Sequence, residues 1–211
     1  MTIPPNEPVV RALLTAAVGE LSMAALRGIA PVLSADAPTT YCGIVAACRN
    51  HSHRTPFPVS PEGLCGSIYL SDRHNMLFRA WHDTVHAQEG RGLDHEGEVH
   101  VSLVQAGDVA DWLCWLDIPH PQRLLVVTYL LADTLGQALY HKFTGGGFVA
   151  DQLGFVRHVV GGTGWIDRDQ LPTSPPEGLT HEQFVDLVRS VGLHARRITS
   201  IRATALAARG G

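Results

Sequence analysis

The segment from Pro121 to Phe143 constrains the fold of this chain more than any other. It reads PQRLLVVTYLLADTLGQALYHKF and is followed by three glycines, so it has the length and the ending of a buried helix. Its polar residues Asp133, Gln137 and His141 recur every four positions and would share one face of that helix. Because burying an unpaired carboxylate is costly, this polar stripe is expected to face water, a partner or a metal.

Apolar residues also recur at helical spacing elsewhere in the chain. Further helices are predicted at residues 9–26, 75–88, 98–116 and 148–160. Proline, serine, threonine and glycine between 35 and 63 predict mostly loop, with at most a short strand or helical turn at 41–47. A short strand is expected at 66–70. The predicted fold class is all-α, a helical bundle with long loops.

The C-terminal part is predicted to be a separate αα-hairpin. Thr180 and Gln183 form a capping box that begins a helix, and Gly192 would end it before a second helix that carries arginines. The expected division is a main domain at 1–168, a linker at 169–179 and the hairpin at 180–211. Nucleic-acid binding is expected, if at all, only through this hairpin.

Composition points to a globular protein of the cytoplasm. The chain has 211 residues, a net charge of −4 and four cysteines without a CxxC pair, which favours a reducing compartment. The start lacks the pattern of a signal peptide. The longest apolar run, Leu124 to Ala132, is about half of the ~20 residues that cross a bilayer, so no membrane association is expected.

A candidate metal site lies in the next predicted helix. His82 and His86 are four positions apart, which places both imidazoles on one helix face, and Asp83 lies between them. Carboxylates from other helices, Glu98 and Asp133, would complete the coordination. A divalent ion is expected, with Zn, Mn, Fe and Ni not distinguished.

Three simpler interpretations stay open. In a chain with twelve histidines, His82 and His86 can be a chance pair on the surface. Asp83 can pair with Arg79 on the same helix. Asp133 can form a buried hydrogen bond with Gln137 without any metal.

A second histidine segment lies in the predicted loop. The run from Arg49 to Arg54, RNHSHR, places an HxH pair between two arginines and could bind a metal or a phosphate. The prolines that follow it forbid a continuing helix, so a solvated polar loop is the favoured interpretation.

Two family resemblances follow from these motifs. HDTVH at 82–86, followed by HEGE at 95–98, resembles the HDxxH…HxGE signature of HD-domain metal-dependent phosphohydrolases. That resemblance implies an all-α fold and hydrolysis of a phosphate ester at a metal bound by an upstream histidine, the His-Asp doublet and a later aspartate. Carried over to this chain, His82 and Asp83 would be ligands, Asp133 the last aspartate, and His86 or Glu98 an assisting group. His51 and His53 have the right separation for the first histidine.

The second resemblance covers roughly residues 70 to 142. FRAWHD at 78–83, the Gly97-Glu98 pair and DTLGQ at 133–137 are similar to the FRAxHD, GE and ETxGQ blocks of a phage-associated family, often found inside large polyvalent proteins. Glutamate usually stands where this chain has Asp133.

The expected function is a metal-dependent hydrolase that acts on a small-molecule phosphate ester or nucleotide. Its metal ligands would be His82, Asp83, His86 and Asp133, with Glu98 and Asp83 as the catalytic acid or base. A zinc peptidase is one rival, because HDTVH is one methylene short of HExxH. The other is a structural or interaction protein, for example a virion component or a homo-oligomer, that docks through Trp112, Trp115 and the C-terminal arginines.

Overall fold

The computed structural model describes residues 6–62, 66–147, 149–165 and 174–207, and it confirms an all-α helical bundle. The main helices are α1 (Glu7–Ala25), α2 (Tyr41–Asn50), α3 (Asp72–Glu89), α4 (His95–Trp115), α5 (His120–Asp133), α6 (Leu135–Thr144), α7 (Gln152–Val160) and α8 (His181–Ala207). A π-helical turn, η1 (Gly161–Trp165), continues α7, and the short strands β1 (Val32–Leu33) and β2 (Pro58–Val59) pair in parallel.

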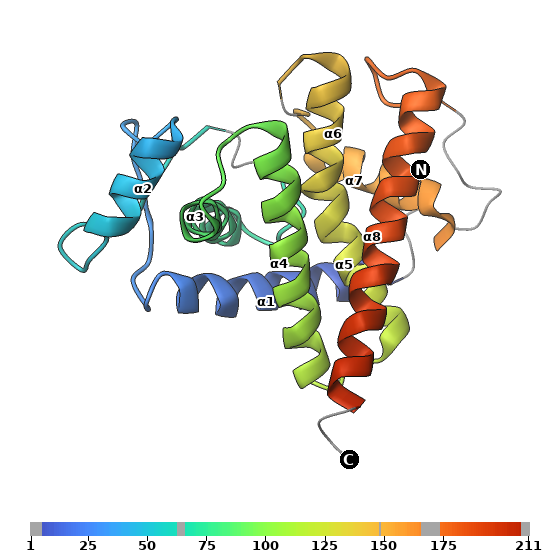
Figure 1. Ribbon diagram of the computed structural model, residues 1–211, viewed down its shortest axis with the longest axis horizontal. Helices are drawn as coiled ribbons and strands as arrows, with labels where there is room; N and C mark the ends of the chain where they lie inside the picture. The colour runs from blue at the N-terminus through green and yellow to red at the C-terminus, as the bar shows by residue number, and fades with distance from the viewer. Residues whose placement is uncertain (1–5, 63–65, 148, 166–173, 208–211) are drawn as a thin grey trace.

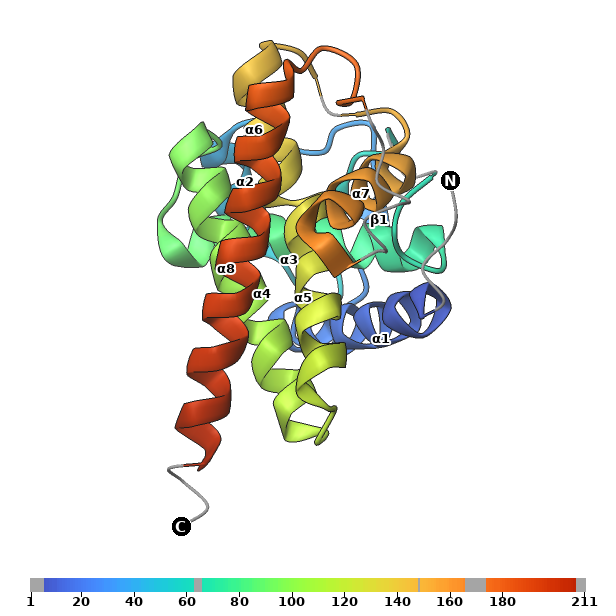
Figure 2. The ribbon, with the colours of Figure 1, turned by 90° about the vertical axis from the view of Figure 1, so that its right-hand side faces the viewer.

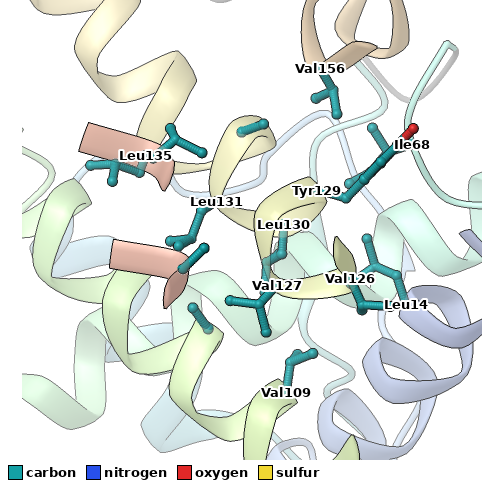
Figure 3. Close-up of a cluster of buried hydrophobic side chains, with 14 of the residues drawn as sticks. Leu14, Ile68, Val109, Val126, Val127, Tyr129, Leu130, Leu131, Leu135 and Val156 are labelled. Atoms are coloured by element: carbon teal, nitrogen blue, oxygen red, sulfur yellow. The ribbon is translucent and has the colours of Figure 1, made fainter. Parts of the chain in front are cut away.

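Helix α5 is the centre of the bundle. It packs against α1, α4, α6, α7 and α8, and Figure 3 shows its side chains pointing outward in several directions to meet those neighbours. Val127, Tyr129, Leu130 and Leu131 are fully buried. A helix that is apolar on all sides in this way must be covered on all sides, which explains the bundle.

Two helices cross the upright part of the bundle. Figure 1 looks almost along the axis of α3, with α4 standing beside it and α1 passing below. Helix α1 packs against both α3 and α5. The crossing brings the middle of α3 against the first turns of α4.

The predicted C-terminal hairpin is wrong. A single helix, α8, runs through Gly192 and lies along α4 and α5 (Figure 2). Val191 and Ala195, on either side of the glycine, are fully buried in the same core as α5. Burial of these two side chains outweighs the ~1 kcal/mol that glycine costs in a helix. Part of the expected linker lies outside the described residues.

Three other predictions need correction. The segment 121–143 is divided at Thr134, whose hydroxyl donates a hydrogen bond to the Leu130 carbonyl at 3.0 Å, a contact that bends helices. The region at 41–47 belongs to helix α2, which begins where the Thr40 side chain accepts a hydrogen bond from the Gly43 amide. No strand forms at 66–70, where the described backbone consists of turns and bends.

Helix α1 is, among the described helices, the one long and apolar enough by length and composition to cross a membrane. A core helix of a soluble protein passes the same test. Here Val10, Leu14, Ala17 and Val18 are buried within the bundle, which is compatible with a soluble protein.

Candidate metal centre

The turn between α3 and α4 sets the position of the candidate site. Helix α3 ends at Gly90, which adopts the left-handed conformation, and α4 begins after Asp94, whose carboxylate accepts a hydrogen bond from the Gly97 amide at 2.8 Å. A side chain at Gly97 would collide with the Gly92 carbonyl oxygen. The tight turn therefore requires glycine at 97 and places Glu98 in the first turn of α4, opposite α3.

Three side chains meet across this crossing. His82 and His86 of α3 have their Nε2 atoms 3.1 Å apart. The Glu98 carboxylate lies 3.1 Å from His82 Nε2 through Oε2 and 3.4 Å from His86 Nε2 through Oε1. Ligand atoms at tetrahedral Zn–N and Zn–O bond lengths are separated by about 3.3–3.4 Å, so this group can hold a metal ion.

The Nδ1 atom of each imidazole has a hydrogen-bond partner that holds the ring in place. His86 Nδ1 lies 3.1 Å from the Arg91 carbonyl oxygen, and His82 Nδ1 lies 2.9 Å from Gln105 Oε1. Each oxygen is an acceptor, so each Nδ1 carries the hydrogen and each neutral ring presents a bare lone pair at Nε2. Such partners orient the histidines of metal sites.

Burial and charge favour a cation between these groups. Two bare Nε2 atoms at 3.1 Å repel each other unless a proton or a metal lies between them. Burial lowers the pKa of His82, but the hydrogen bond and charge of Glu98 outweigh it and the net pKa is raised. Burial raises the pKa of Glu98, but the two histidines hold it well below its usual range. His82 and Glu98 therefore stabilise each other's charged forms.

The three side chains differ in exposure. The His86 side chain has no exposed surface, whereas those of His82 and Glu98 are 18% and 23% exposed. An ion held by these three residues alone would keep its fourth tetrahedral position for a water molecule or a substrate. Structural zinc sites are instead closed by four protein ligands.

Asp83 lies beside this group without belonging to it. The group of possible metal ligands among the described residues contains His82, His86 and Glu98 alone. Burial raises the pKa of Asp83 to about 6, against the opposing charges of His82, His86 and Arg79. Arg79 donates hydrogen bonds to backbone carbonyls of the loop before α3, at Ser60 and Glu62.

Asp133 forms a hydrogen bond with Gln137, which was one of the simpler interpretations of the sequence. Gln137 Nε2 donates to Asp133 Oδ1 at 2.9 Å across the junction of α5 and α6. Burial raises the pKa of Asp133 to about 7, and this carboxyl is near enough to His82 for the two charges to interact. Asp133 therefore lies near the three-residue group but outside it.

The surroundings of Asp133 contain unsatisfied polar atoms. Tyr69 Oη, Gln137 Oε1 and Gln105 Nε2 are buried, and none has a hydrogen-bond partner among the described residues. The pKa of Tyr69 is raised by burial and by the charge of Asp133. Buried polar groups of this kind usually bind ordered water or a ligand.

The two candidates for the upstream histidine of the HD resemblance lie outside the possible metal group. His51 Nε2 bonds to the Leu26 carbonyl. Neither His51 nor His53 belongs to the group found among the described residues. The sequence reasoning missed Gln105 and the Arg91 carbonyl. Gln105 lies seven positions after Glu98, on the same face of α4, and that spacing was the available signal.

Comparison of the chain with known protein families, curated proteins and solved structures finds no match.

Proposed function

We propose that this protein is a metal-dependent hydrolase whose divalent ion is held by His82, His86 and Glu98. The observation that carries the proposal is the set of three donors at tetrahedral separations. Fixed Nδ1 partners and the partial exposure of His82 and Glu98 support it. Glu98, expected from the sequence as an acid or base, is thereby proposed as a ligand.

The bound ion would polarise a substrate oxygen and lower the pKa of a coordinated water toward ~7. His82, His86 and Glu98 hold the ion, and Gln105 keeps the His82 ring in the tautomer that binds it. Asp83 is the proposed acid or base because its raised pKa, about 6, allows it to exchange a proton near neutral pH.

Phosphate esters, including nucleotides, are the first proposed substrates, because HDTVH and HEGE resemble the HD-domain phosphohydrolases. One observation favours a second candidate, the hydrolysis of peptide bonds. Two histidines from one helix and a glutamate from another form the donor set of catalytic His₂Glu zinc sites in peptidases.

The non-enzymatic alternative assigns the same residues a structural role. Trp115 is 77% exposed at the end of α4 and would then belong to a docking surface. The three-residue donor set favours the enzyme, because structural zinc sites are closed by four protein ligands and this group offers three.

Metal content tests the proposal first. We expect about one equivalent of divalent metal in the wild type by plasma mass spectrometry, and its loss in the His82→Ala/His86→Ala and Glu98→Gln variants. His100→Ala is the matched control, since His100 pairs with Glu89 at the surface. Asp133→Asn should keep the metal if three residues form the centre. Gln105→Leu should weaken binding about 10–100-fold in competition with a chelator.

Activity distinguishes the substrates. Panels of phosphate esters, nucleotides and peptides would be tested with wild type, Glu98→Gln and Asp83→Ala, each with and without added metal. Hydrolysis that requires metal and falls in both variants supports the proposal. A wild type that binds no metal, is unchanged by chelator and hydrolyses nothing would contradict it and favour the structural role.

A further inference from the structure

A second site lies on the opposite side of α3 from the metal centre. The end of α1, helix α2 and helix α3 enclose a pocket of about 310 Å³. Thr84 and Gln88 contribute from α3, about half a helical turn away from His82 and His86. The volume lies at the lower limit for small-molecule sites.

The charged side chains that line the pocket are basic, and the Asp83 carboxyl lies behind the lining, near Cys48. Arg27 and Arg49 line it, and no carboxylate does so within the described part of the chain. Burial raises the pKa of the Cys48 thiol, with the nearby charge of Asp83 acting in the same direction, so the thiol stays neutral. In a chain with a net charge of −4, a pocket with two guanidinium groups and no acid of its own favours an anion.

His51 adds a polar atom without a partner. Its Nε2 donates to the Leu26 carbonyl at 2.9 Å, which fixes the ring, while Nδ1 is buried and has no hydrogen-bond partner among the described residues. His51 is one of the residues that line the pocket, and its Nδ1 is a polar atom that a ligand could satisfy. His51 and Arg49 belong to the RNHSHR segment, which the metal centre does not use.

A simpler explanation accounts for only part of this arrangement. Arg27 and Arg49 lie near the C-terminal ends of α1 and α2, where basic side chains are favoured by the helix dipole. That effect requires neither a shared cavity nor an unpaired imidazole nitrogen. The helix dipole also gives no reason for Arg27 to adopt a left-handed conformation, with φ of 54°, next to Gly28.

We propose that this pocket binds a phosphate group, either as inorganic phosphate or as part of a phosphate ester. Arginine forks match the oxygens of phosphate, and His51 Nδ1 would accept a hydrogen bond from its protonated oxygen. The site is independent of the metal centre, so the two proposals can fail separately.

The test uses metal-free protein, so that phosphate cannot bind through a metal. Isothermal titration with inorganic phosphate, and with adenosine monophosphate against adenosine, would be compared with acetate at the same ionic strength. We expect binding of phosphate or of the nucleotide, and none of adenosine or acetate. The His82→Ala/His86→Ala variant should bind phosphate as the wild type does.

Variants assign the binding to the pocket. Arg27→Gly removes one guanidinium and suits the left-handed backbone, and Arg49→Gln removes the other. Each should weaken binding about tenfold, and the double variant more. Arg54→Gln, in the same segment but outside the lining, is the control and should bind normally. Binding no stronger than that of acetate, or unchanged in the double variant, would overturn the proposal, provided that circular dichroism shows a folded protein.

Discussion

Asp133 shows how the burial of one carboxyl group makes stability depend on pH. Its side chain is 6% exposed, and its pKa is raised by burial to about 7. A raised carboxyl pKa means that the native state prefers the protonated form. The contribution of this group to stability is therefore highest below the unfolded pKa, near 4, falls between about pH 4 and pH 7, and levels off above the native pKa.

We predict that Asp133→Asn removes this dependence. The amide keeps an oxygen that can accept the hydrogen bond from Gln137 but does not ionise. Between pH 5 and pH 8, the metal-free wild type should lose about 2–3 kcal/mol relative to the variant. Urea unfolding at the two pH values measures the difference. Parallel pH profiles for the two proteins would show that Asp133 is not the group responsible.

The residues of the candidate site were partly accessible from the sequence. Helical spacing predicted that His82 and His86 share a face, and Glu98 was selected as a carboxylate from another helix. The sequence could not show that the crossing of α3 and α4 would bring Glu98, and not Asp133, between the two imidazoles. Whether Glu98 or Asp133 reaches the histidines depends on the angle of the turn between α3 and α4. The spacing of residues along the sequence does not give that angle.

At the scale of elements, the turn between α3 and α4 controls the site through Gly97. We predict that Gly97→Ala costs about 1–3 kcal/mol in unfolding free energy, because the new methyl group would collide with the Gly92 carbonyl. It should also weaken metal binding by displacing Glu98. Thermal unfolding and chelator competition measure the two effects.

Gly147→Ala is the matched control for that prediction. A Cβ at Gly147 would meet no atom within 4 Å, so this variant should differ from wild type by less than about 0.5 kcal/mol. Equal behaviour of the two alanine variants would show that the turn tolerates a side chain at 97.

Sequence patterns predicted the helices better than their ends. Apolar periodicity identified the segments of α1, α3, α4 and α5 because each has a wide buried face. It failed at Gly192 and at Thr134, where the outcome depends on what packs against the helix or on one side-chain hydrogen bond. Helix α2 was not predicted, because it is short and lies among turn-forming residues.

At the scale of the whole molecule, one ion pair joins distant parts of the chain. Arg157 of α7 binds Glu7 at the start of α1 through two nitrogens, at 2.7 Å and 2.9 Å. Tyr129 of α5 donates to the same carboxylate at 3.3 Å. Glu7 is only 2% exposed, so these partners replace the water that its carboxylate would bind at the surface.

We predict that Arg157→Met destabilises the protein by about 2–4 kcal/mol, because it leaves the Glu7 carboxylate buried without a counter-charge. Adding Glu7→Gln to that variant should restore part of the loss. Denaturant unfolding measures both. Arg189→Met, which breaks an exposed pair with Asp186, should cost less than about 0.5 kcal/mol. Similar losses for the two arginine variants would contradict the role assigned to burial.

The proposed metal centre is also local in sequence. Its three ligands and both supporting groups lie between His82 and Gln105, whereas α8 begins at His181 and packs against helices far upstream. Contacts between near neighbours in the chain close with little loss of entropy and form early. All of the groups proposed to hold the ion therefore leave the ribosome well before α8, the helix that packs along α4 and α5.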